Sequence, residues 1–96
     1  RRMRRVARAP SFRRTLRRYL RRNPQDRDRV ARALERLAAN PFEPTLETHM
    51  LKGELSGLWA CTVAYDCRIV FDFVTDPRTN EEIILLIRIG THAEVY

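Results

Sequence analysis

The sequence predicts an α+β fold: an N-terminal strand, a basic helical hairpin packed on a small, mostly antiparallel sheet of about four strands, and a short C-terminal tail. Two observations support this prediction. Apolar residues recur at helical spacing between residues 11 and 40, and from residue 59 onward they alternate with small or polar residues, as in half-buried strands. The 96 residues suffice for one modest core, so we expect a single domain over residues 1–96.

The N-terminal strand and the first helix are expected within residues 3–22. Residues Met3 to Ala9 hold too few apolar side chains for a helical stripe, so we expect a short strand at the edge of the sheet. Ser11 is expected to cap the helix that follows. The apolar stripe of this helix falls at i, i+4, i+7 and i+8, on Phe12, Leu16, Tyr19 and Leu20.

The second helix has clear start and stop signals. Asn23 is expected as its N-cap, Pro24 as its first residue, and Asp26 in its first turn, where a carboxylate interacts favourably with the helix dipole. Asn40 and Pro41 end it. Its apolar stripe comprises Val30, Ala33, Leu34, Leu37 and Ala38.

A β-hairpin is expected after the linker at residues 41–57. Its odd positions are apolar: Trp59, Cys61, Val63, Cys67, Ile69, Phe71 and Phe73. Both runs share one buried face if residues 64–66 form a three-residue loop, which would pair Val63 with Cys67. This register sends Thr62 and Arg68 together to the opposite face.

The last strand is expected at about Glu82 to Ile89. It is apolar on nearly all sides, which is typical of a strand inside a sheet rather than at its edge. Its alternation places Arg88 on the face of Arg68. Gly90 then allows the chain to turn into the tail.

Charge is distributed unevenly along the chain, whose net charge is +7. Through Arg36 there are fifteen arginines and three acids, a balance of +12, whereas the remainder carries four cations and nine acids, a balance of −5. This asymmetry favours a protein that docks on nucleic acid or on an acidic partner. The alternative is an arginine-rich helix face that is only solvated.

Several classes of protein are disfavoured by the sequence. No stretch of about 18 apolar residues is present, and no apolar region follows the arginine-rich start, so we expect a cytoplasmic protein with neither a membrane span nor a signal peptide. Cys61 and Cys67 have no partner pair at zinc spacing, and we expect two reduced core thiols without a metal.

The chain has two histidines, His49 and His92. Histidine is the side chain that titrates near neutral pH without perturbation. His92 is the stronger candidate for a functional group. It lies two residues after Gly90, just beyond a buried strand, where a histidine has no packing role.

The predicted elements follow the order strand, helix pair, antiparallel strands and tail. The chain also contains the segments HMLKGELSGLW, YDCRIVFDF and IGTHAEVY, in this order. In this the chain resembles the RelE/ParE superfamily of bacterial toxins from toxin-antitoxin modules, and especially its YafQ-like mRNA interferases. The resemblance implies a small α+β protein that enters the ribosomal A site, cuts mRNA without a metal or other cofactor, and is held inactive by a cognate antitoxin.

The resemblance also implies roles for individual residues. His92 would be the general acid, His49 the general base, and Asp66 an orienting or alternative base. Arg68 would stabilise the charged phosphorane and Tyr96 would stack on or orient a base. Further RNA contacts are expected from Lys52, Arg88, Arg13, Arg14, Arg17, Arg18, Arg21 and Arg22.

The chain departs from the family pattern at one catalytic position. YafQ-like toxins carry a further histidine where this sequence has Thr62, which cannot do acid–base work near neutral pH. Arg88 and Ala93 also stand where many close relatives have an acidic residue, so the site is either poorer in catalytic groups or uses Arg88 as an extra cation. The site is therefore expected to depend on the ribosome to position the mRNA.

Plainer interpretations exist for each candidate. His49 could be a solvated loop histidine, Asp66 could shape a turn, and Tyr96 could anchor the tail. Arg68 could pair with Asp66 or Asp72. At the level of function, the alternatives are a ParE-like toxin that binds DNA gyrase and a basic nucleic-acid-binding module without catalysis.

Overall fold

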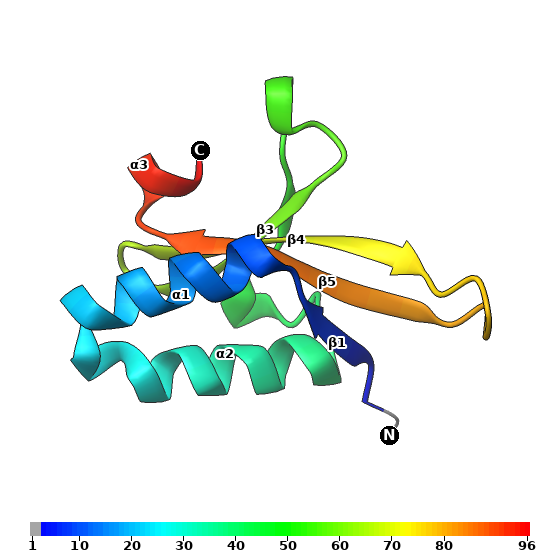
Figure 1. The fold of residues 1–96 in the computed structure, drawn as a ribbon, viewed down its shortest axis with the longest axis horizontal. Helices are drawn as coiled ribbons and strands as arrows, with labels where there is room; N and C mark the ends of the chain where they lie inside the picture. Colours follow the sequence, from blue (N-terminus) through cyan, green and yellow to red (C-terminus); the bar gives the residue numbers. More distant parts are fainter. Residues whose placement is uncertain (1–2) are drawn as a thin grey trace.

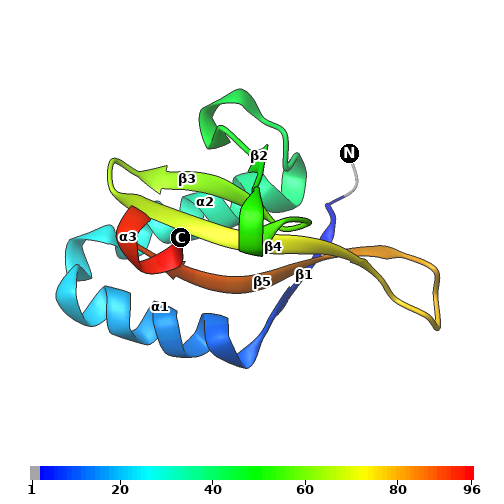
Figure 2. The same cartoon turned by 90° about the horizontal axis from the view of Figure 1, so that it is seen from above.

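The structure is a computed structural model that describes residues 3–96. It is an α+β fold in which a five-stranded sheet in the order β1-β5-β4-β3-β2 carries two long helices on one face and a short C-terminal helix on the other (Figures 1 and 2). Its elements are β1 Arg5–Arg8, α1 Pro10–Arg22, α2 Arg27–Ala39, β2 His49–Met50, β3 Trp59–Ala64, β4 Cys67–Thr75, β5 Glu82–Gly90 and α3 His92–Val95.

The sheet has one strand more than the sequence predicts. The additional strand is β2, whose His49 and Met50 pair with Ala60 and Trp59. Two residues are too few to show an alternating pattern, so sequence periodicity cannot detect such a strand. The expected edge position of β1 is confirmed, and β5 lies inside the sheet between β1, to which it is parallel, and β4, to which it is antiparallel.

Helix α1 begins two residues earlier than a Ser11 cap would place it. Its N-cap is Ala9, and Pro10, with its fixed φ and missing N–H, occupies the first turn. The prediction that Ser11 caps the helix is therefore wrong. The Ser11 hydroxyl instead donates to the carbonyl of Ile87, which fastens α1 to β5.

The connection to α2 contains an extra 3₁₀ turn, Pro24–Asp26. The prediction that Asn23 caps the second helix and Pro24 begins it is wrong, because both belong to this turn, and α2 has Asp26 as its N-cap and begins at Arg27. The Asn23 side chain donates back to the Tyr19 carbonyl at 3.1 Å and makes no cap. Asp26 is buried, and its carboxylate accepts from the Tyr19 hydroxyl and, at 2.7 Å, from Arg29 Nη1. The carboxylate therefore joins the two helices rather than only meeting a helix dipole.

The register of the β3–β4 hairpin is partly as predicted. Thr62 pairs with Arg68, which is confirmed, but Cys67 pairs with Ala64 and not with Val63. The register shifts between Thr62 and Ala64, so Val63 is the extra residue of a bulge and the turn shrinks to residues 65–66. With the bulge, as with a three-residue loop, the odd-numbered apolar residues of both strands share one face. The sequence pattern alone therefore cannot distinguish the two.

The main core lies between α1, α2 and the sheet. Its fully buried side chains include Phe12, Leu37, Leu46, Phe71, Ile84 and Leu86. Cys61 and Cys67 belong to this core as free thiols, and burial raises their pKa to about 12 and about 11. The thiols are thus protonated and shielded, as expected for core cysteines. Among residues 3–96, no helix is long and apolar enough to span a membrane.

Candidate active site

The sheet face turned away from α1 and α2, here called the open face, presents its residues in rows across the strands. One row runs from His49 through Ala60 and Val70 to Arg88, since each pairs with the next. Neighbouring strands lie about 4.8 Å apart, so the ends of this row are separated by three spacings, or roughly 14 Å between backbones. His49 and Arg88 therefore share the open face but stand at opposite sides of it.

The next row toward the β3–β4 turn contains Thr62, Arg68 and Gly90. Arg68 Nη1 donates to the carbonyls of Ala64 and Tyr65 at 2.9 and 3.1 Å. Within residues 3–96 Arg68 forms no ion pair, so neither Asp66 nor Asp72 neutralises it. Its charge is held at the turn by backbone carbonyls and remains available to an anion.

Helix α3 is placed on the open face by a capping box. The Thr91 side chain accepts from the Glu94 N–H, and the Glu94 carboxylate accepts from the Thr91 N–H at 2.9 Å. The hydrogen bond from the Thr91 N–H to the carboxylate is the main reason that the pKa of Glu94 is lowered. Val95 is buried against Ala60 and Val70, and this contact packs the helix on the sheet. The T-x-x-E pattern that signals this box is visible in the sequence.

Gly90 leaves room for the close approach of α3. A Cβ at this position would lie 2.9 Å from Glu94 Oε1 and 3.1 Å from Glu94 Cβ. The glycine therefore serves contact between β5 and α3, rather than an unusual backbone angle at a turn.

His92 and Tyr96 are in direct contact at this end of the open face. Their rings meet edge to face, with centroids 4.5 Å apart and an interplanar angle of 89°. The His92 N–H donates to Asp66 Oδ1 at 3.2 Å, which ties α3 to the β3–β4 turn. The His92 side chain is exposed, and burial raises the pKa of Tyr96 while the nearby Arg68 charge opposes that rise.

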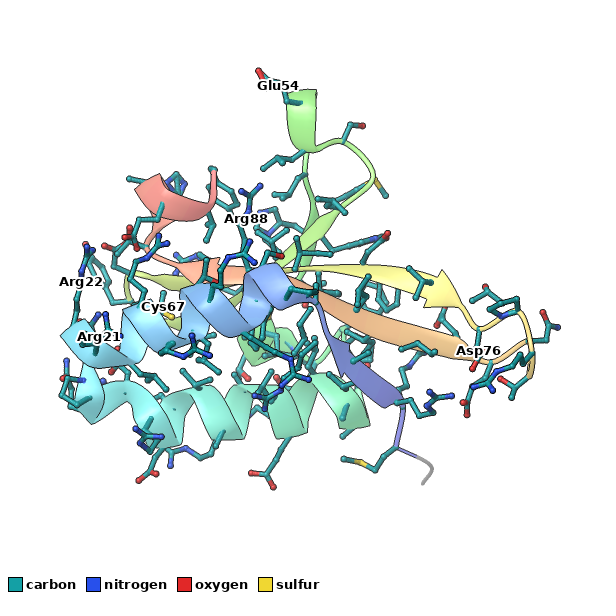
Figure 3. The ribbon with its side chains drawn as sticks, viewed as in Figure 1. Arg21, Arg22, Glu54, Cys67, Asp76 and Arg88 are labelled. Atoms are coloured by element: carbon teal, nitrogen blue, oxygen red, sulfur yellow. The ribbon has the colours of Figure 1, made fainter. Side chains whose placement is uncertain are left out.

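A pocket of about 510 Å³ adjoins Tyr96. It is lined by Leu51, Lys52, Glu54, Leu55, Arg88 and Tyr96. Figure 3 shows Arg88 between α3 and the projecting arm that carries Glu54. Arg88 Nε is buried without a hydrogen-bond partner, an uncommon state for a buried donor. Three predicted residues, Lys52, Arg88 and Tyr96, are thus brought together around a space open to a ligand.

His49 is not part of the cluster around His92. It is exposed on β2, and its Nδ1 lies 3.0 Å from the carbonyl oxygen of Glu47. The structure also shows a carboxylate that sequence reasoning missed, because Glu47 Oε1 accepts from the Thr62 hydroxyl at 2.9 Å. Glu47 has a left-handed backbone (φ 50°), and no motif marks it in the sequence.

The six arginines of α1 do not form a single surface. Arg13, Arg17 and Arg21 line a groove of about 480 Å³ together with Arg8 and Arg27. The other row follows the side of α1 next to α3. There Arg22 Nη1 pairs with Glu94 Oε2 at 3.1 Å, and Arg18 lines a small cavity that Arg88 and Glu94 also line. Helical spacing places Arg14 in this second row.

Comparison with known structures identifies the fold of the chain. YafQ from E. coli strain BL21(DE3) superposes with a TM-score of 0.76 at 18% identity, covering 97% of this chain and 98% of that chain. The E. coli DinJ-YafQ toxin-antitoxin complex matches with a TM-score of 0.74 at 18% identity, with 98% of each chain covered. The YoeB/ParE toxin from Agrobacterium tumefaciens matches with a TM-score of 0.72 at 16% identity, covering 92% and 98%.

The chain thus has the fold of a RelE/ParE-like toxin. A family model described as the bacterial toxin of type II toxin-antitoxin system, YafQ, matches residues 4–96. The protein belongs to this YafQ toxin family. A comparison with curated proteins finds no match. Among the described residues, no group of three His, Cys, Asp or Glu side chains is arranged to hold a metal ion.

Proposed function

We propose that this YafQ-family toxin is a ribosome-dependent endoribonuclease that cuts mRNA in the A site and so arrests translation. The observation that carries the proposal is the cluster at the end of the open face, where the His92 imidazole contacts Tyr96 and the His92 backbone is held by Asp66. An exposed acid–base group, an aromatic ring and the nearby Arg68 are the parts that RNA cleavage requires.

In the proposed reaction the RNA supplies its own nucleophile. A base removes the proton of the 2′-hydroxyl, the 2′-oxygen attacks the adjacent phosphorus, and the bond to the 5′-oxygen breaks. His92 donates a proton to that leaving oxygen. The products are a 2′,3′-cyclic phosphate and a 5′-hydroxyl.

We propose Asp66 rather than His49 as the base. His49 is at the far edge of the open face, whereas the Asp66 carboxylate already contacts the His92 backbone. This placement favours Asp66 as the base that works with His92. His49 would then contact a neighbouring part of the mRNA, a role that its exposed position on β2 permits.

The charged phosphorane would be stabilised by two cations near Tyr96, Arg68 and Arg88. Arg68 has no acidic partner within residues 3–96, and Arg88 has a buried Nε without an acceptor. Such preorganised donors stabilise developing negative charge most effectively where water is excluded. Lys52, which lines the same pocket as Arg88, would hold the RNA backbone.

A cognate antitoxin is part of the proposal. The E. coli YafQ structure in complex with DinJ is a toxin-antitoxin assembly of a protein with this fold. We propose that the partner of this chain is acidic in its toxin-binding segment and folds on binding. It would act by displacing Tyr96 from His92, by covering the arginines of α1, or by both.

The test is induction of the protein in growing cells, with and without the neighbouring open reading frame. The proposal predicts rapid mRNA cleavage and translation arrest, both reversed by the co-expressed neighbour, and recovery of a complex of the two proteins. A DNA-damage response with intact mRNA would instead identify a gyrase poison. Recovery of a harmless, partner-free protein would contradict the toxin function in this chain.

A further inference from the structure

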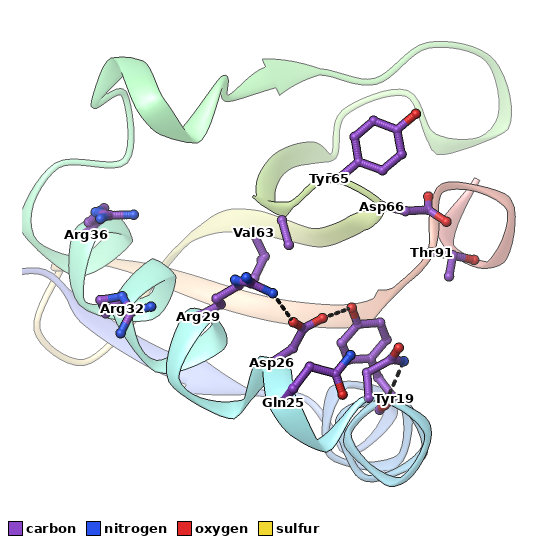
Figure 4. Close-up of a pocket in the computed structure, with 12 residues that line it drawn as sticks. Tyr19, Gln25, Asp26, Arg29, Arg32, Arg36, Val63, Tyr65, Asp66 and Thr91 are labelled. Carbon is purple, nitrogen blue, oxygen red and sulfur yellow. Dashed lines mark hydrogen bonds and ion pairs between the residues drawn. The ribbon is translucent and has the colours of Figure 1, made fainter.

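A groove with no role so far lies between α2 and the tip of the β3–β4 hairpin. Its volume is about 550 Å³, and it is lined by Arg29, Arg32 and Arg36 from α2 and by Tyr65 and Asp66 from the hairpin turn. Figure 4 shows the three arginines in a row along the helix. Pockets that hold small organic ligands measure about 300–1,000 Å³, so the groove has room for a nucleotide.

The outward charge of this groove is positive. Asp26 lines its floor, but this carboxylate is buried and already accepts hydrogen bonds from the Tyr19 hydroxyl and from Arg29. Arg29 therefore offsets Asp26. Arg32 and Arg36 are exposed and form no ion pair within residues 3–96. Arg32 and Arg36 thus line the groove without an ion pair, against the one exposed carboxylate of Asp66, and guanidinium binds phosphate well.

Tyr65 contributes an aromatic surface at the rim. Its side chain is 97% exposed, the highest value among the large hydrophobic residues that are exposed. Short hairpin turns favour Asn, Asp and Gly, so the turn does not need a tyrosine for its geometry. Unpaired bases stack on solvated aromatic rings while cations hold their phosphates, and this groove has such a ring at its rim and arginines along α2.

The groove is continuous with the candidate active site through Asp66. This residue lines the groove and also accepts the backbone hydrogen bond of His92. Thr91, the residue before His92, lines the groove as well. The β3–β4 turn, α3 and the connection between α1 and α2 lie at the same end of the molecule (Figures 1 and 2).

We propose that this groove binds the single-stranded RNA segment adjoining the nucleotide that is cut. Tyr65 stacks on a base of that segment, and Arg32 and Arg36 bind its phosphates. That the RNA is a substrate rests on the proposed function. An acidic peptide could also bind the two arginines. Its carboxylates would not stack on an exposed aromatic ring as a base does, and this favours RNA as the occupant.

The proposal can be tested by fluorescence without any cleavage. Tyr65→Trp places a reporter at the rim. Trp59, the one tryptophan of the chain, packs against Phe42 and Phe73 and serves as the internal reference. The probe is a short single-stranded RNA with 2′-O-methyl groups, which cannot attack its own phosphates. We expect saturable quenching in the Tyr65→Trp protein and none in the parent.

Matched charge variants then locate the phosphates. In the Tyr65→Trp background, Arg32→Ser and Arg36→Ser should each weaken RNA binding about three- to tenfold and reduce the slope of log K against log salt by about 0.7. Arg78→Ser removes the same charge from the β4–β5 turn and should leave the affinity unchanged. On ribosomes, Tyr65→Ala should alter the base preference beside the cut.

Three results would overturn the proposal: no quenching by RNA, quenching that is indifferent to Arg32 and Arg36, or equal quenching by an acidic peptide, which would make the groove a protein-docking surface. The outcome is separable from the proposed function. Quenching without mRNA cleavage on ribosomes would leave an RNA-binding groove and remove the nuclease. Cleavage without quenching would leave the nuclease and remove the groove.

Discussion

The backbone N–H of His92 donates to the Asp66 carboxylate, and this hydrogen bond joins two residues that are 26 positions apart in the chain. Because the bond uses the backbone of His92, the imidazole is left exposed, and among the aromatic rings of residues 3–96 it contacts only that of Tyr96. Asp66 can therefore fix the start of α3 and still present a carboxylate oxygen to a substrate.

Asp66→Asn separates these two roles. Asparagine keeps an acceptor for the His92 N–H but is no base, so we expect normal folding and a cleavage rate about 10²- to 10⁴-fold lower. Asp66→Ala should in addition lower the thermal midpoint, since it removes the link to α3. Single-turnover cleavage on programmed ribosomes and a thermal melt measure the two effects. Parental cleavage by Asp66→Asn would assign the base elsewhere, with His49→Ala as the next variant.

Arg68 is expected to act on the phosphorane as well as on the hairpin. Arg68→Ala should lower the cleavage rate by roughly 10²-fold or more, the scale of losing one preorganised charge. Arg68→Lys keeps a charge but cannot reproduce the guanidinium geometry at the turn, so we expect partial recovery of rate. Arg78→Ala is the control for removing an exposed arginine. A rate reduction that simply follows the fall in thermal stability in both Arg68 variants would leave only a structural role.

Gly90→Ala tests whether the placement of α3 matters. The new Cβ would lie 2.9 Å from Glu94 Oε1, so α3 must shift or the Glu94 side chain must leave its cap. We expect a decrease of about 1–3 kcal/mol in the free energy of unfolding, the usual cost of overpacking, and a lower cleavage rate. Denaturant unfolding and the ribosome assay measure both. Gly57→Ala, in open space on the projecting arm but at φ 96°, shows the effect of backbone strain away from α3.

The two arginine rows of α1 should differ in their contribution to ribosome binding. Replacing Arg13, Arg17 and Arg21 by Ser removes three cations from one groove and should flatten the salt dependence by roughly 0.7–0.9 for every phosphate that is no longer neutralised. Replacing Arg14, Arg18 and Arg22 should have a smaller effect, since Arg22 is already paired with Glu94. Sedimentation with ribosomes at several salt concentrations measures both. Unchanged affinity in the first triple variant would make that row a solubility feature.

Much of the fold could be predicted from residue spacing. The helical stripes that contain Phe12 and Leu37 and the pairing of Thr62 with Arg68 follow from the periods of helix and strand. The Val63 bulge could not be predicted, because a bulge and a longer turn preserve the same parity. Nor could the cap of α1, where Pro10 competes with Ser11 for the same turn.

The part of the candidate site whose geometry depends on local sequence could be predicted. The part that depends on the pairing of strands distant in sequence could not. The spacing from Gly90 to Tyr96 contains the α3 cap and both rings, so their proximity is a local property. The separation of His49 from this cluster depends on β2 joining the far edge of the sheet. The hydrogen bond between Glu47 and Thr62 depends on the same strand pairing. No sequence pattern in the linker predicts that pairing.

The chemistry of the cut ends tests the central claim most directly. Reporter mRNA is incubated with programmed ribosomes and the purified protein, and the ends of the fragments are identified by their response to phosphatase and polynucleotide kinase. Attack by the 2′-oxygen with His92 as the acid predicts 2′,3′-cyclic phosphate and 5′-hydroxyl ends, and no fragments with His92→Ala. Fragments with 3′-hydroxyl and 5′-phosphate ends, or undiminished cleavage by His92→Ala, would contradict the account.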